Sequence, residues 1–180
     1  YWNDISAAAP NTDFIIYNIP QLAGVALSTD LLRTMLKNPK VIGVKNSSMP
    51  TQDIQMWKDE GCIVFNGPDE QFISGLAMGA VGGIGGTYAV MPELFLKLNE
   101  LIVAGERDKA TELQYAINEI IYKMCSSHAN MYAVAKEILR INENLDLGGV
   151  REPLENLQEA DKAIAKQAAE MIVAAKAKYC

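Results

Sequence analysis

Short apolar runs recur along the first part of the chain and predict strands. Three consist mainly of large aliphatic residues and one is rich in glycine; they cover residues 13–19, 41–44, 62–65 and 79–87. Continuous apolar runs of this length are typical of strands that are covered on both faces, as in parallel sheets. Pro20 and the Asn66-Gly67-Pro68 turn follow two of the runs and mark where those strands end.

The segments between these runs have the spacing and end signals of helices. Ser28, Thr29 and Asp30 form a capping signal ahead of a helix over residues 31–37. Further helices are expected over residues 1–9, 53–60 and 69–78. Strands that alternate with helices in this way predict right-handed βαβ crossovers and a parallel sheet. Four such units fit either half of a (β/α)₈ barrel or a small doubly wound domain.

The second part of the chain predicts helices alone. Pro92 stands at the first turn of a helix, Gly105 and residues 146–153 interrupt the helical pattern, and an alanine-rich helix closes the chain. We therefore divide the chain into residues 1–100, which hold the four βα units, and residues 101–180, a helical extension that packs on them.

Composition narrows the classes of function. The 180 residues are 49% hydrophobic and 21% charged, which is enough apolar material for a buried core. The net charge is −6 and lysine and arginine do not cluster, which argues against nucleic acids and anionic membranes as partners. No apolar run is long enough to cross a membrane, and the first residues lack a signal-peptide pattern. We expect a cytoplasmic protein.

Cysteine and histidine offer little for metal or disulfide chemistry. The three cysteines are widely spaced and form no CxxC pair, so reduced thiols are expected. The single histidine, His128, falls in a stretch that we expect to be helical, and one histidine alone does not make a metal site. The sequence therefore predicts no metal site.

Lys45 is the first candidate for chemistry. It directly follows the run 41–44, at the carboxyl end of a buried strand, where both candidate folds carry their active sites. Partial desolvation there favours the neutral amine, which can attack a ketone. Tyr17 lies near the end of the first strand, where its hydroxyl can exchange a proton beside Lys45. The alternatives are a lysine whose stem covers apolar surface and a tyrosine of the core.

Two further strand ends carry candidate binding groups. Asp69 and Glu70 follow the turn after the third strand; they can bind substrate hydroxyls, or they can stabilise the first turn of a helix through its dipole. The glycine run 82–86 is not a dinucleotide fingerprint, because Tyr88 stands where the third glycine belongs. We interpret the run as a strand end where backbone approaches a ligand or a neighbouring strand closely.

Four motifs in this order resemble the N-acetylneuraminate lyase and dihydrodipicolinate synthase family of class I aldolases. They are Tyr17-Asn18-Ile19-Pro20, Gly43-Val44-Lys45-Asn46-Ser47-Ser48, Asn66-Gly67-Pro68-Asp69-Glu70 and Gly82-Gly83-Ile84-Gly85-Gly86-Thr87-Tyr88. The likeness runs over nearly the whole chain, and the separation of Tyr17 from Lys45 is also similar to the family's.

The resemblance implies a fold and a reaction. The fold is a (β/α)₈ TIM barrel with extra C-terminal helices, usually a homotetramer, of which this chain carries strands five to eight. The reaction is the cleavage of N-acetylneuraminate to pyruvate and N-acetylmannosamine, with no cofactor beyond a covalent lysine imine. Lys45 matches the lysine that forms this Schiff base, and Tyr17 matches the tyrosine that relays the proton.

The resemblance also implies which residues bind the substrate. They are Ser47, Gly67, Asp69, Glu70 and Gly85. The Asp69-Glu70 pair points to the sialate-cleaving branch, while dihydrodipicolinate synthase or another pyruvate-dependent aldolase stays as the alternative. Gly86 departs from a serine found there in some lyases, which removes one hydroxyl contact to the substrate tail.

Two parts of the family's site would lie in the first half of the barrel. These are a Ser/Thr pair that binds the carboxylate and a tyrosine from a neighbouring subunit. Because residues 1–9 predict a helix with no strand before it, we expect the chain to be cut from something longer. We expect the 180 residues alone to be a poor catalyst, or a half-barrel that needs a partner half.

Overall fold

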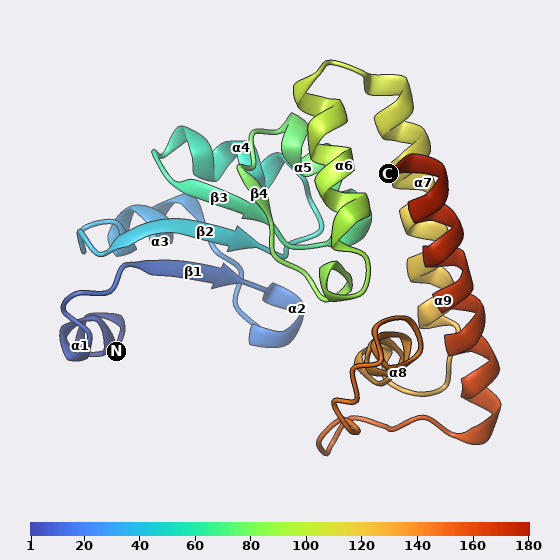
Figure 1. Ribbon diagram of the computed structural model, residues 1–180. Coiled ribbons are helices and arrows are strands. Elements are labelled where there is room, and N and C mark those ends of the chain that lie inside the picture. Colours follow the sequence, from blue (N-terminus) through green and yellow to red (C-terminus); the bar gives the residue numbers. More distant parts are fainter. The chain divides into compact units, whose positions relative to one another are not determined.

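A four-stranded parallel sheet dominates the first part of the chain. The computed structural model describes residues 1–180, which divide into two units, residues 1–85 and 86–180. The strands follow one another in sequence order and are β1 (Phe14–Asn18), β2 (Val41–Asn46), β3 (Ile63–Asn66) and β4 (Gly82–Gly83) (Figure 1). All three pairings are parallel, so the expected parallel α/β fold is confirmed.

Helices connect the strands as predicted. These helices are α1 (Trp2–Ala8), α2 (Pro20–Ala23), α3 (Thr29–Met35), α4 (Gln52–Asp59) and α5 (Phe72–Ala77). The structure differs from the prediction at two of the helices and at one strand. The four-residue α2 was not predicted, because one turn is too short to show a helical period. The expected helix over 69–78 is divided into a 3₁₀ turn, η1 (Asp69–Gln71), and α5. The glycine-rich strand is also much shorter than expected, because glycines offer no side chains to pack along a sheet.

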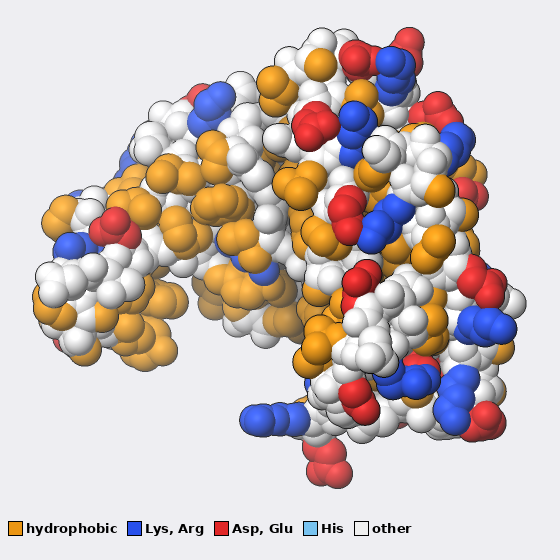
Figure 2. Space-filling view, viewed as in Figure 1, with side chains coloured by type: hydrophobic (Ala, Val, Ile, Leu, Met, Phe, Trp, Pro, Cys, Tyr) orange, Lys and Arg blue, Asp and Glu red, His pale blue; other side chains and the backbone are white.

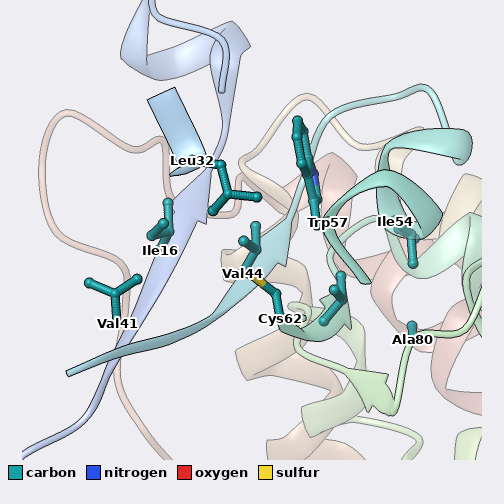
Figure 3. Close-up of a cluster of buried hydrophobic side chains, with 9 residues drawn as sticks. Ile16, Leu32, Val41, Val44, Ile54, Trp57, Cys62 and Ala80 are labelled. Carbon is teal, nitrogen blue, oxygen red and sulfur yellow. The ribbon is translucent and has the colours of Figure 1, made fainter. Parts of the chain in front are cut away.

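The core of this unit lies on one face of the sheet. Ile16, Val44 and Val64 come from successive strands, and Leu32 from α3 and Trp57 from α4 cover them (Figure 3). A doubly wound sheet reverses its strand order and carries helices on both faces. The consecutive order seen here, with α3 and α4 packed on the same face, instead matches an arc of a barrel.

The second unit contains helices and no strand, as predicted. After a 3₁₀ turn, η2 (Thr87–Ala89), come α6 (Pro92–Val103), α7 (Arg107–Cys125), α8 (Met131–Glu143) and α9 (Glu159–Tyr179). His128 does not lie in a helix: it occupies the bend between α7 and α8, and its side chain is 84% exposed. None of the helices in either unit has the length and apolar character needed to span a membrane.

Asp161 ties the bend before α8 to the start of α9. Its carboxylate is buried and accepts hydrogen bonds from Ser127 Oγ (2.9 Å), His128 N (3.0 Å) and Gln158 N (2.9 Å). The bond from Gln158, followed by those from His128 and Ser127, lowers the pKa of Asp161 below its ordinary value of 3.8 even though burial acts in the opposite direction. Asp161 therefore stabilises the fold as a carboxylate.

Replacing Asp161 by asparagine should lower the thermal unfolding midpoint at pH 7 by several degrees, because an amide N–H₂ then faces the Gln158 N–H. A carboxyl group whose pKa is depressed on folding stabilises the protein above its unfolded pKa and loses that effect as the pH falls through the folded value. The difference from the parent should therefore shrink below pH 3.8. Glu159→Gln, at an exposed carboxylate of the same helix, is the control. Equal shifts for both variants would contradict the role of Asp161.

Candidate active site

Tyr17 and Lys45 lie side by side at the carboxyl ends of β1 and β2. The strand register pairs Tyr17 with Lys45, and Lys45 with Phe65 of β3. Because side chains alternate across a strand, Val44 points into the core while Lys45 points to the other face. Lys45 is half-buried and Tyr17 is 52% exposed. In Figure 2, hydrophobic side chains gather over the strands on the face that α3 and α4 leave uncovered, where Ile15 and Ile63 are exposed.

The contact between these two side chains is close. The Nζ atom of Lys45 lies 3.9 Å from the centroid of the Tyr17 ring. The face of an aromatic ring attracts an ammonium group, so this contact restricts where the lysine side chain can go. The pair places an amine, which can act as a nucleophile, next to a phenol, which can donate or accept a proton.

Ser47 and Gly67 form a second pair, one strand further along. The Gly67 N–H donates to the Asn46 carbonyl at 2.8 Å and continues the parallel ladder beyond β3. Ser47 Oγ occupies the space that a side chain at position 67 would need, and the Asn46 carbonyl would lie only 2.6 Å from an added Cβ. Gly67 therefore allows the Ser47 hydroxyl to sit between the two strand ends.

Asp69 and Gly85 form a third pair. Asp69 is the first residue of η1 and is buried, whereas Glu70 is half-buried. The Asp69 carboxylate fills the position that a Cβ at Gly85 would take. The structure thus brings the seven predicted site residues together as three contacting pairs, with Glu70 next to the third, all at the carboxyl edge of one sheet.

A row of buried asparagines lies directly beyond these residues, and the sequence analysis missed it. Asn18, Asn46 and Asn66 are neighbours in the strand register and are 4%, 1% and 0% exposed. The sequence did contain a signal, because an asparagine follows Tyr17, Lys45 and Phe65 at the end of each strand. Nothing in a single strand indicates that the three residues become neighbours in the sheet.

Neither unit contains a group of three or more His, Cys, Asp or Glu side chains placed to hold a metal ion.

The comparison with protein families agrees with this arrangement of motifs and strands. Residues 1–172 match the model of the dihydrodipicolinate synthetase family. The chain belongs to this family.

Individual members are similar over almost the whole chain. The N-acetylneuraminate lyase of Mediterraneibacter gnavus is 66% identical over 99% of this chain and 58% of its own length. A solved structure described as a Ruminococcus gnavus sialic acid aldolase catalytic lysine mutant is 65% identical, with a TM-score of 0.98 over 100% of this chain and 60% of its own.

A more distant member has been solved with a ligand. The N-acetylneuraminate lyase of Fusobacterium nucleatum, complexed with pyruvate, is 27% identical, with a TM-score of 0.87 over 96% of this chain and 58% of its own. The chain thus spans about three fifths of the length of these family members, 58–60%.

Gly85→Ala should displace the Asp69 carboxylate, because the new methyl group would overlap it. We expect the activity of the full natural protein to fall by roughly a hundredfold, the size of loss that a misplacement of about 1 Å can cause. The matched control is Gly82→Ala, whose Cβ would only touch the Phe65 ring at 3.9 Å. Steady-state rates and thermal midpoints of both variants test this expectation. Equal activity of the two variants would show that Asp69 need not occupy this position.

Proposed function

We propose that the protein containing this chain is a class I aldolase that cleaves N-acetylneuraminate to pyruvate and N-acetylmannosamine. The observation that carries the proposal is the contact of Lys45 Nζ with the Tyr17 ring, 3.9 Å from its centroid, at the carboxyl edge of the sheet. The similarity to lyases of this substrate, one of them 66% identical, supports the choice of substrate over dihydrodipicolinate synthesis.

The first step joins the substrate to Lys45. The neutral amine attacks the ketone carbon of the open-chain sugar acid and forms a carbinolamine. Tyr17 donates its proton to the hydroxyl of this adduct, which leaves as water, and a protonated imine remains beside the Tyr17 phenolate. The positive nitrogen of the imine can accept an electron pair from the neighbouring carbon–carbon bond. The likeness to a structure described as a catalytic lysine mutant supports a covalent role for a lysine of this family.

The second step breaks the carbon–carbon bond. Tyr17 removes the proton from the C4 hydroxyl, the C3–C4 electron pair moves toward the imine nitrogen, and N-acetylmannosamine leaves as the aldehyde. The remaining enamine takes up a proton at C3, and water hydrolyses the imine to give pyruvate and free Lys45. Proton transfer by a positioned side chain contributes about 10²–10⁴-fold to such a reaction.

The other site residues are proposed to bind the substrate. Ser47 and Gly67 lie next to Lys45 along the sheet edge, where their hydroxyl and backbone groups can contact the substrate near the imine. Asp69 and Glu70 present carboxylates that suit the hydroxyl groups of a sugar tail. Gly85 is proposed to contact the substrate through its backbone, because Asp69 fills the position that a side chain there would take.

The remaining features of the proposal concern the whole protein. We propose that the reaction needs no metal or organic cofactor, since the lysine imine itself supplies the electron sink. We also propose a cytoplasmic location, as expected from the composition, and a homotetrameric assembly, as implied by the resemblance.

Borohydride trapping tests the proposed function directly. Incubation of the full natural protein with pyruvate and borohydride should reduce the imine to a stable secondary amine, which peptide mass spectrometry should locate at Lys45. Lys45→Arg keeps the charge over the Tyr17 ring but should form no adduct, because a guanidinium is not a nucleophile at neutral pH. Adduct formation on another lysine would refute the assignment of Lys45.

A product assay separates the substrate classes. In the direction of synthesis, pyruvate should condense with N-acetylmannosamine and not with aspartate semialdehyde. Trapping at Lys45 together with condensation only onto aspartate semialdehyde would keep the aldolase mechanism and overturn the substrate.

The 180-residue chain on its own should turn over N-acetylneuraminate far more slowly than the full natural protein. The face that carries Lys45 leaves Ile15 and Ile63 exposed, so the imine would form in contact with water. Water weakens the electrostatic interactions that stabilise charge in the transition state. Turnover numbers of the two proteins at equal concentration provide the test. Near-equal values would contradict this expectation.

A further inference from the structure

Asn18 and Asn46 directly follow the two residues of the proposed chemistry. Because side chains alternate, Tyr17 and Lys45 lie on one face of the sheet while these two asparagines lie on the other. There the side chains bond to each other, Asn18 Nδ2 donating to Asn46 Oδ1 at 2.8 Å. The pair therefore links β1 to β2 directly behind the contact between Tyr17 and Lys45.

The Asn46 amide has a partner on each side. Its Oδ1 also accepts a hydrogen bond from Trp57 Nε1 of α4 at 2.9 Å, and its Nδ2 donates to Ser48 Oγ at 2.8 Å. Ser48 in turn donates to the Asp53 carboxylate at 2.7 Å. The Ser48 hydroxyl also lies 3.1 Å from Asn46 Oδ1. Asn18 Nδ2 and Trp57 Nε1 both donate to this oxygen, so an amide turned over would set its N–H₂ against two donors. A buried amide held in this way is costly to rotate or move.

Asn18 is held from its own side as well. Its Oδ1 accepts a hydrogen bond from the Leu27 backbone N–H at 3.2 Å, which fixes the segment that leads from α2 to α3. Its carbonyl accepts from the Ser47 N–H at 2.8 Å, and this bond extends the pairing of β1 and β2 past the last residue of each strand. The two residues that follow Lys45 are thus both bonded to Asn18, Asn46 through its side chain and Ser47 through its backbone N–H.

The third asparagine of the row provides a comparison. Asn66 has the same register position on β3 and is also buried, but its Nδ2 donates to the Pro68 carbonyl at 2.7 Å, within its own turn. No hydrogen bond joins its side chain to Asn46. A buried asparagine at a strand end therefore does not by itself produce a bond between strands, and this bond occurs between the two strands that carry Tyr17 and Lys45.

We propose that Asn18 and Asn46 are positioning residues for the aldolase reaction, and that their hydrogen bond holds the Tyr17 ring against Lys45. The inference rests on the proposed function. Tyr17 and Lys45 each precede by one residue an asparagine of the Asn18–Asn46 hydrogen bond. If the ends of β1 and β2 rotated relative to each other, the Tyr17 ring would therefore move away from the Lys45 amine. The proton transfer then loses its geometry, while the groups that bind the sugar tail, on β3 and beyond, keep theirs.

The test uses Asn18→Ser in the full natural protein, since a serine hydroxyl is too short to reach Asn46. The kcat for N-acetylneuraminate cleavage should fall by roughly ten- to a hundredfold, as expected for a misplaced reacting group. The KM should stay within about twofold, because the substitution leaves the proposed substrate-binding groups in place. Loss of an interaction that is made only in the transition state lowers kcat and leaves KM unchanged.

The control for lost stability is Ser28→Ala. It removes one side-chain hydrogen bond of the same unit, from Leu31 N to the N-cap of α3, at an exposed position away from the site. We expect a lower thermal midpoint with kcat within about twofold of the parent, as for a helix cap that does not touch the site. If Asn18→Ser does not fold, Asn18→Asp replaces it, because this isostere keeps the acceptor for Leu27 N–H and sets a carboxylate oxygen against Asn46 Oδ1 in place of the donor.

Two kinds of failure can be told apart. If the parent forms no borohydride-trapped adduct with pyruvate, the proposed function falls and the inference falls with it. If the parent forms the adduct but the Asn18 variant keeps its kcat, or loses no more than Ser28→Ala at an equal midpoint, only the positioning role is overturned. A loss of kcat at unchanged KM, beyond that of the control, supports it.

Discussion

The alternation of side chains along a strand is the constraint on which the first unit depends. Consecutive residues point to opposite faces, so each strand end presents one residue to the open face and the next one to the core. Tyr17 and Lys45 lie on the open face, and Asn18 and Asn46 lie on the buried face. A shift of one residue in either strand would exchange the two sets, because the period of a strand is two residues. The same pattern that builds the core therefore also decides which groups are available for chemistry.

Close approach between strand ends is the second constraint. Four parallel strands end at one edge, and their following turns must share that edge. Ser47 beside Gly67, and Asp69 beside Gly85, occupy the volume that a side chain on the glycine would take. The glycines thus contribute space, and the polar groups beside them are held in place by van der Waals contact with backbone. A Cβ at Gly67 or Gly85 would overlap these groups, whereas a Cβ at Gly82 would make only an ordinary van der Waals contact with the Phe65 ring.

Much of the fold follows from local pattern. The strands at 14–18, 41–46 and 63–66 lie where the apolar runs predicted them, and the helix after Ser28 begins at the capping signal. Local pattern failed where packing or geometry overrides it. Residues 79–87 form only two residues of strand, since glycine has little tendency to extend a sheet. His128 lies in a bend, because Asp161, far along the chain, accepts a hydrogen bond from its backbone.

The sequence by itself determined the alternation of strands and helices, the strand-end position of Lys45 and Tyr17, and the motifs of the family. These depend on periodicity and on residue order, which are local properties of the chain. Only the tertiary structure decided that Lys45 lies over the Tyr17 ring, that Asp69 packs on Gly85 and that Asn18 bonds to Asn46. Each of these contacts joins different strands or turns, and its existence depends on the register between them. That register is set by the packing of α3 and α4 on the sheet and by the pairing of whole strands, which no single segment contains.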